Sequence, residues 1–135
     1  MYKNILVPIS LDHERDANGA LEIARAIGEE GAKVTLLHVI EQVQPYVASQ
    51  IPEGVLMANR QRVEEELAEL SKTTPGSATV VVTGHSSRTI LDWASDHEVD
   101  CIIIASHRPG MQDLLLGSTA ARVVRHAHCA VHVVR

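Results

Sequence analysis

The segment that decides the fold runs from Cys101 to His126 and has the sequence CIIIASHRPGMQDLLLGSTAARVVRH. It consists of an apolar run, a loop of small and polar residues, and a stretch with helical periodicity. A short, continuous β-branched run is typical of a strand that is buried on both faces. The segment therefore predicts one strand, loop and helix of a parallel sheet, with Gly117 and Ser118 opening the helix.

The rest of the chain alternates in the same way. Helical spacing fills the gaps between apolar runs, with Gly28 and Gly31 as stops for the first helix and Ser86 or Ser87 as the cap of a later one. A polar stretch at 41–54, marked by Pro45 and Pro52, is a candidate lid. Strands are predicted at 3–8, 33–40, 78–83, 101–105 and 130–134. This alternation predicts an α/β fold with right-handed crossovers and helices on both faces of the sheet.

Composition limits the classes of protein. The chain has 135 residues, 45% of them hydrophobic, with one Trp and no Phe, which predicts a single domain over 1–135 without aromatic stacking as a general binding device. The formal net charge of −5 argues against a nonspecific nucleic-acid surface. We find neither a signal-peptide pattern nor an apolar run long enough to span a bilayer, so we expect a cytoplasmic protein that is not inserted in a membrane. Cys101 and Cys129 are expected as reduced, buried thiols.

The loop after the fourth predicted strand lies where a ligand is expected. In parallel α/β sheets, ligands bind beyond the carboxyl ends of the strands. At the start of the last helix, Gly117 allows close approach of the backbone, and the free N–H groups near Ser118 and Thr119 favour an anion such as phosphate. Arg108 adds a guanidinium suited to phosphate. An ordinary, well-capped loop explains the same residues equally well, and neither GxxxxGK[ST] nor GxGxxG is present.

Four stretches together resemble the universal stress protein family across essentially the whole chain. They are VPIS, LLHVI, IIIASHRP and LLGSTAARVVRHAHCAVHVVR. Many members of that family carry G-x-x-G-x9-G-[ST] in this loop, a pattern associated with ATP binding. Here Ala105 and Arg108 replace the first two glycines and eight residues separate Arg108 from Gly117. The combination of ASHRP with LLGS resembles a variant group within the family.

The resemblance implies a flavodoxin-like (Rossmann-like) sheet of five parallel strands in the order 3-2-1-4-5. It also implies an adenine-nucleotide site for ATP, or ADP or AMP, with or without Mg²⁺. Ser10 departs from the family pattern, which usually has an Asp there, and Asp12 follows two positions later. The implied contacts fall into three groups: Pro8, Ile9, Ser10 and Val39 around the base, Ala105, Ser106, His107 and Arg108 along the ribose and phosphates, and Gly117, Ser118 and Thr119 at the phosphate chain.

Catalytic and metal sites are not predicted. No nucleophile stands beside a recognisable base, so we expect binding rather than strong catalysis, and His107 is expected to position the loop or a ribose hydroxyl. The cluster His126 to Cys129 and the acidic stretch 12–16 are better explained by helix-end electrostatics than by metal binding. His38 and His132 are expected as satisfied core or interface residues.

Three classes of function remain. The first is a nucleotide-binding regulatory protein of the stress response, in which ATP or a relative stabilises one conformation that an unidentified protein partner recognises. The second is a weak ATP hydrolase or phosphotransferase. The third is a nucleotide-free dimeric interaction module or transporter-associated regulator. The Gly117–Ser118 helix start favours the first two, and the missing catalytic pair favours the first and third.

The last predicted strand suggests how the protein assembles. A fifth strand at the edge of the sheet presents unpaired N–H and C=O groups, and residues 130–135 lack the Pro or inward-facing Lys that protects such edges. Relatives in the resembled family commonly dimerise there. We therefore expect a two-fold homodimer in which two copies of 130–135 pair antiparallel and His132 lies near the partner.

Overall fold

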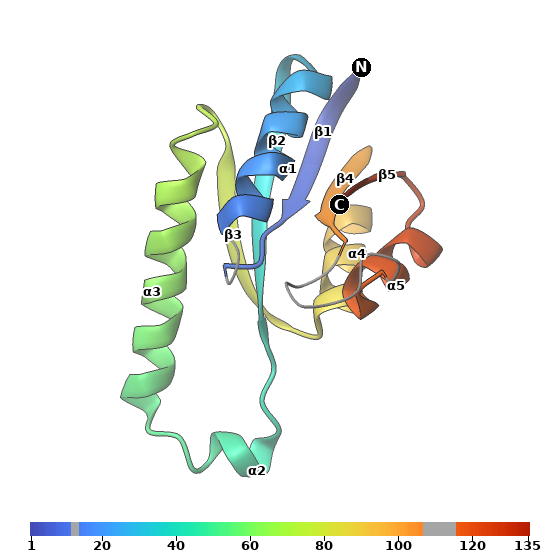
Figure 1. Cartoon of the computed structure of the whole chain (residues 1–135). Coiled ribbons are helices and arrows are strands. Elements are labelled where there is room, and N and C mark those ends of the chain that lie inside the picture. The colour runs from blue at the N-terminus through green and yellow to red at the C-terminus, as the bar shows by residue number, and fades with distance from the viewer. Residues whose placement is uncertain (12–13, 107–115) are drawn as a thin grey trace.

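The five strands form one parallel sheet in the order β3-β2-β1-β4-β5, as the sequence predicts. The computed structural model describes residues 1–11, 14–106 and 116–135. The strands are β1 Tyr2–Pro8, β2 Gly28–Glu41, β3 Ala78–Gly84, β4 Cys101–Ala105 and β5 Ala130–Val134. The helices are α1 Glu14–Ile27, α2 Pro45–Ala48, α3 Glu53–Ser71, α4 Ser86–Asp96 and α5 Ser118–His126. Figure 1 shows the chain in these labels.

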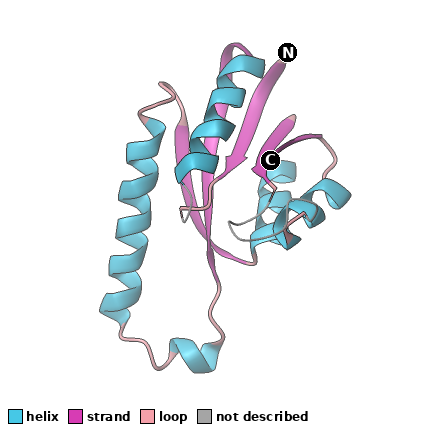
Figure 2. Ribbon diagram, viewed as in Figure 1, coloured by secondary structure: helices cyan, strands magenta, loops and turns pink. Residues whose placement is uncertain are grey.

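The sheet is covered on both faces, which explains its apolar strands. Alternate residues of β1 enter different cores: Ile5 and Val7 pack with α1 and α3, and Leu6 packs with α4 and α5. The same alternation holds on β4, where Ile102 and Ile103 are both fully buried but on opposite faces. Figure 2 shows the helices arranged around the sheet in this way. Because side chains alternate across a strand, a strand with both faces covered must be apolar throughout.

Two boundaries differ from the sequence prediction. Strand β2 begins at Gly28, not at residue 33, because Tyr2 pairs with Gly28 before a register shift brings Asn4 opposite Lys33. The prediction that Ser86 or Ser87 caps α4 is wrong. The cap position belongs to His85, and the Ser86 N–H donates to the carboxylate of Glu41 at 3.3 Å.

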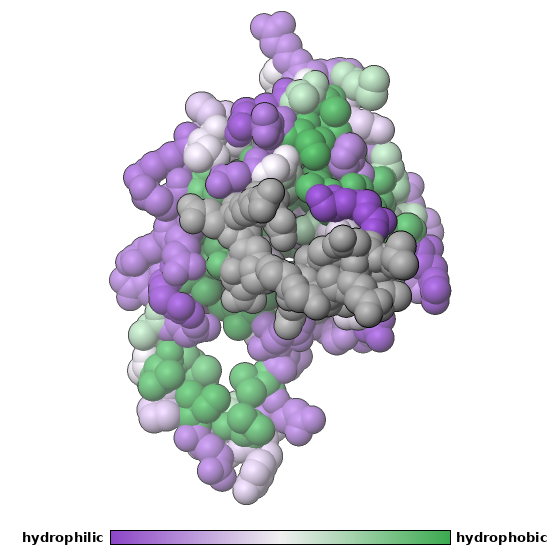
Figure 3. Space-filling view, in the orientation of Figure 1, coloured by the Kyte–Doolittle hydropathy of each residue, from purple (hydrophilic) through white to green (hydrophobic). Residues whose placement is uncertain are grey.

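The charged helix α3 packs against the sheet through one apolar face. Val63 and Leu67 are buried and Leu70 is half-buried on the face toward the sheet. The preceding stretch contains the short helix α2, and together with the first turns of α3 it forms an arm that extends beyond the carboxyl end of β2 (Figure 1). Figure 3 shows hydrophobic surface on this arm. The exposed apolar residues there are Val43, Tyr46, Val47, Val55, Leu56 and Met57.

Candidate functional site

The carboxyl edge of the sheet has a topological switch point between β1 and β4. From β1 the chain continues to β2 on one side, and β4 lies on the other side of β1. Such a point is the usual ligand position in open α/β sheets, because the connections diverge there and leave a crevice. The site residues expected from the sequence lie at this edge or, for His107 and Arg108, outside the described residues.

The segment after β1 is fixed through Ile9. Its N–H donates to the carbonyl of Leu37 at 2.8 Å, and its carbonyl accepts from Nδ1 of His38, also at 2.8 Å. The side chain of Ile9 is buried in the core between the sheet and α1. With its backbone groups and side chain engaged, Ile9 positions its neighbours, the half-buried Pro8 and the exposed Ser10.

His38 is a positioning residue that the sequence did not mark as part of the site. Its half-buried ring supports the loop after β1, which confirms the expectation of a satisfied histidine. Val39, the next residue, lies beyond the point where β1 stops pairing, since the last β1 pair is Pro8 with Leu37. Strand β2 therefore extends past β1 and places the half-buried Val39 at the carboxyl edge.

The end of β4 and the start of α5 are joined through Ser106. Its N–H donates to the carbonyl of Val134 at 2.8 Å, and its carbonyl accepts from the N–H of Gly117 at 2.6 Å. Ala105 is paired with Val134, so both C-terminal strands end at this point. Although residues 107–115 lie outside the described part, the two ends of that segment are held together next to the switch point.

Helix α5 begins as predicted, with Gly117 as its cap residue. Within the described part of the chain, no side chain caps this helix, and its first turn contains no acidic residue. Ser118 is exposed and Thr119 is half-buried. Since the first N–H groups of a helix have no partner within the helix, this start favours an anion.

Gly117 is not required by the backbone conformation. Its φ of −59° and ψ of 155° suit any residue. A side chain here would meet no conformational penalty from φ. Substitutions at Gly117 are therefore compatible with the backbone of the helix start.

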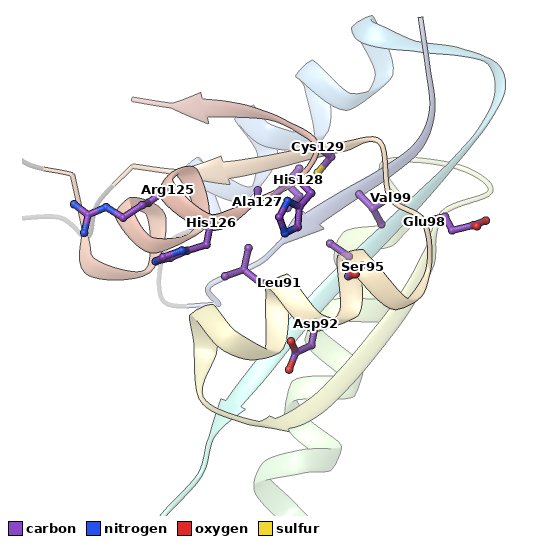
Figure 4. Close-up of a pocket in the computed structure, with 12 residues that line it drawn as sticks. Leu91, Asp92, Ser95, Glu98, Val99, Arg125, His126, Ala127, His128 and Cys129 are labelled. Atoms are coloured by element: carbon purple, nitrogen blue, oxygen red, sulfur yellow. The ribbon is translucent and has the colours of Figure 1, made fainter.

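A cleft of about 660 Å³ lies elsewhere, between α4 and α5 (Figure 4). It is bordered by the last turns of both helices and by the residues that enter β5, so it faces the amino ends of β4 and β5. Val99, Ile102 and Ala127 give it apolar walls, and Glu98 and His128 lie at its polar rim. Because ligands of this fold class bind at the opposite edge, we do not assign the nucleotide site to this cleft.

The two cysteines are free thiols near the same end of the sheet. Burial raises the pKa of Cys101 from 9.0 to about 11, and the neighbouring Cys129 and Asp100 add to the effect. Burial and Asp100 also raise the pKa of Cys129, which is half-buried rather than buried as expected. Since reactive thiols have lowered pKa values, neither cysteine has the properties of a nucleophile.

Metal binding finds no support in residues 1–11, 14–106 and 116–135, where no group of three or more His, Cys, Asp or Glu side chains could hold an ion. The acidic residue Asp12 of the candidate stretch 12–16 lies outside the described residues. Among the helices that the structure describes, none combines the length and apolar character needed to cross a membrane.

Sequence comparison identifies the class of protein. The profile of the Universal stress protein family matches residues 1–135. "Universal stress protein A homolog 2" of Coxiella burnetii is 31% identical over 142 residues, covering 99% of this chain and 95% of the relative. The chain belongs to the universal stress protein family.

Solved structures agree with this assignment. Hypothetical protein MJ0577 has a TM-score of 0.83 at 26% identity, covering 99% of this chain and 96% of its own. Universal stress protein UspA from Lactobacillus plantarum has a TM-score of 0.73 at 27% identity, covering 99% and 98%.

Three more distant structures of the family contain adenine nucleotides. A universal stress protein in complex with cAMP has a TM-score of 0.71 at 17% identity, covering 99% of this chain and 97% of its own. The protein from Archaeoglobus fulgidus in complex with dAMP has a TM-score of 0.67 at 16% identity, and the match covers 99% of this chain and 98% of the other. The AMP-bound protein from Arabidopsis thaliana has a TM-score of 0.59 at 17% identity, and the match covers 98% of this chain and 90% of the other. At these identities the likeness shows the fold alone.

Proposed function

We propose that this protein binds an adenine nucleotide at the carboxyl edge of its sheet and acts as a cytoplasmic regulatory protein of the stress response. The observation that carries the proposal is the start of α5, which no described side chain caps and which is tied to the end of β4 through Gly117 and Ser106. Relatives with the same fold that hold cAMP, dAMP or AMP support it.

In this proposal each group has a separate role. The N–H groups and hydroxyls of Ser118 and Thr119 hold the phosphates, because a helix start stabilises negative charge, and Gly117 borders them at the cap position. Pro8, Ser10 and Val39 border the base, with Ile9 holding that segment in place. Ala105 and Ser106 lie along the ribose, together with His107 and Arg108, which the structure does not describe. ATP is the proposed nucleotide, with Mg²⁺ as the counterion of its phosphates.

Ligand-dependent signalling follows if the nucleotide binds two conformations of the protein with different affinities. The chain offers binding groups at this edge, and among the described residues proposed to contact the nucleotide none is a nucleophile with an adjacent base, so regulation explains the site better than catalysis. The regulatory form is a two-fold dimer through β5. This strand pairs with β4 alone in the sheet order and so leaves one edge open to a second copy.

The test is a calorimetric titration of MgATP and AMP into the wild type and Gly117→Val. Since the backbone at Gly117 suits any residue, the variant should fold normally but lose nucleotide binding, because valine obstructs the helix start. The matched control is Gly54→Val, since a side chain at Gly54 would meet no atom within 4 Å. Normal binding by Gly117→Val would place the nucleotide elsewhere.

A further inference from the structure

A second cleft, of about 420 Å³, lies between the amino-terminal part of α4 and the second half of α5. It adjoins the larger cleft of Figure 4, since both are bordered by Leu91, Asp92 and His126. None of its residues belongs to the proposed nucleotide contacts. Its complete lining is His85, Ser87, Arg88, Leu91, Asp92, Arg122 and His126.

Basic groups dominate this cleft in a chain whose formal net charge is −5. Arg88 and Arg122 come from facing helices, and His85 and His126 add two imidazoles. Within the described residues, neither arginine is ion-paired with a carboxylate. The one acidic side chain in the lining is Asp92. Two guanidiniums and one carboxylate leave this cavity with net positive charge, which suits an anion.

The guanidinium of Arg122 is held in place by α4. Its Nη1 lies 3.3 Å from Nε2 of His85, and Nδ1 of the same ring lies 3.3 Å from Oγ of Ser87. Because a guanidinium only donates, Nε2 must accept, so the neutral ring carries its proton on Nδ1 and donates it to Ser87. Ser87 is 4% exposed, which anchors this chain of hydrogen bonds in the protein interior.

This arrangement leaves further N–H donors of Arg122 for a ligand, since a guanidinium has five. The N-terminus of α4 already has an acceptor, because the carboxylate of Glu41 accepts from both the N–H and the hydroxyl of Ser86. The anion site is therefore formed by side chains from two helices and does not depend on the helix terminus.

We propose that the cleft formed by His85, Arg88, Arg122 and His126 binds a phosphate group. The guanidiniums of Arg88 and Arg122 can hold phosphate through charge-assisted, forked hydrogen bonds, and His85 positions Arg122 through its ring. The phosphate has two conceivable sources. Arg122 lies four residues from Ser118, about 6 Å along the helix axis, so the terminal phosphates of a nucleotide held at α5 could reach it; this source rests on the proposed function. The other source is a separate phosphorylated small molecule.

The test is calorimetric titration of the full-length protein with inorganic pyrophosphate at fixed ionic strength. Arg122→Gln and Arg88→Gln should each weaken binding roughly tenfold or more, the usual effect of losing a hydrogen bond to a charged group. Asp92→Asn should tighten binding several-fold, since it removes a like charge. The control Arg62→Gln makes the same change of charge on α3 and should leave binding unaltered. Both Arg88 and Arg122 are exposed, so their variants should fold.

Nucleotide competition distinguishes the two sources. If terminal phosphates occupy the cleft, ATP displaces pyrophosphate and Arg122→Gln weakens ATP but not AMP. If the cleft instead serves a separate phosphorylated molecule, the affinity for pyrophosphate is the same in the absence of ATP and at saturating ATP. Gly117→Val should retain pyrophosphate binding in both cases, so a failure of the proposed nucleotide site leaves this test intact. The proposal is overturned if the wild type does not bind millimolar pyrophosphate, or if Arg62→Gln weakens binding as much as Arg122→Gln.

Discussion

Asp100 connects the start of β1 to the start of β4 through hydrogen bonds, and removing its carboxylate should measurably destabilise the fold. Its carboxylate accepts from the N–H of Lys3 at 2.8 Å and from the N–H of Asn4 at 3.1 Å. Its own N–H donates to the carbonyl of Asn4 at 2.9 Å. Regular pairing between the strands begins immediately afterwards, at Ile5 with Cys101. The carboxylate thus satisfies two backbone donors that precede this ladder.

Asp100→Ala removes a charged acceptor from both donors. Water can replace it at the exposed Lys3, and less easily at the half-buried Asn4. A hydrogen bond to a charged group contributes about 1.5–3 kcal/mol, so one bond lost in full and one in part lowers the unfolding free energy by roughly 2–3 kcal/mol. Asp100→Asn, which retains one acceptor oxygen, should lose about half of this.

Urea denaturation followed by far-UV circular dichroism measures the change. The matched control is Asp96→Ala at the end of α4, where the aspartate is exposed and a negative charge is disfavoured by the helix dipole. It should leave stability unchanged or slightly raised. A loss below about 0.5 kcal/mol for Asp100→Ala would show that water replaces both bonds and would refute this reasoning.

Three further outcomes are expected. Because the pKa of Cys101 is raised from 9.0 to about 11, the unfolded chain releases this proton first. The unfolding free energy should therefore fall by about 2 kcal/mol as pH rises from 9 to 11. Cys101→Ala should flatten most of that slope in urea melts at several pH values. Light scattering at tens of micromolar should find a wild-type dimer and a folded, monomeric Val133→Pro, because proline removes a donor from an edge strand; a wild-type monomer would exclude the β5 interface. ATP turnover should lie far below the roughly 1–100 s⁻¹ of dedicated phosphoryl-transfer enzymes, and a robust rate that is lost in His107→Ala would instead support a hydrolase.

The sequence predicts the sheet well because its strands are set by local pattern. The run at 101–105 is apolar throughout, with three β-branched isoleucines at its centre, and has the same bounds in the structure. The start of β2 was missed because residues 28–32 are mostly glycine and glutamate, and they are strand only through pairing near Tyr2. Local composition does not encode such a pairing.

Of the elements around the candidate site, the sequence predicted those with a local pattern. The start of α5 has a local signal in Gly117 and Ser118, and the structure places it there. The contact of Arg122 with His85 joins residues 37 positions apart, and it exists because α4 and α5 pack on one face of the sheet. His38 reaches Ile9 across 29 positions for a similar reason. Neither pair has a motif, so tertiary packing alone reveals them.

The most direct test of the account is the binding of an adenine nucleotide to the purified wild-type protein. Mass spectrometry of the supernatant after denaturation identifies any nucleotide that copurifies, and calorimetry on nucleotide-stripped protein gives the affinity. The account predicts an adenine nucleotide in the supernatant, or saturable binding of MgATP or AMP by the stripped protein. A clean supernatant together with no heat and no thermal shift at millimolar MgATP, ADP and AMP would contradict it.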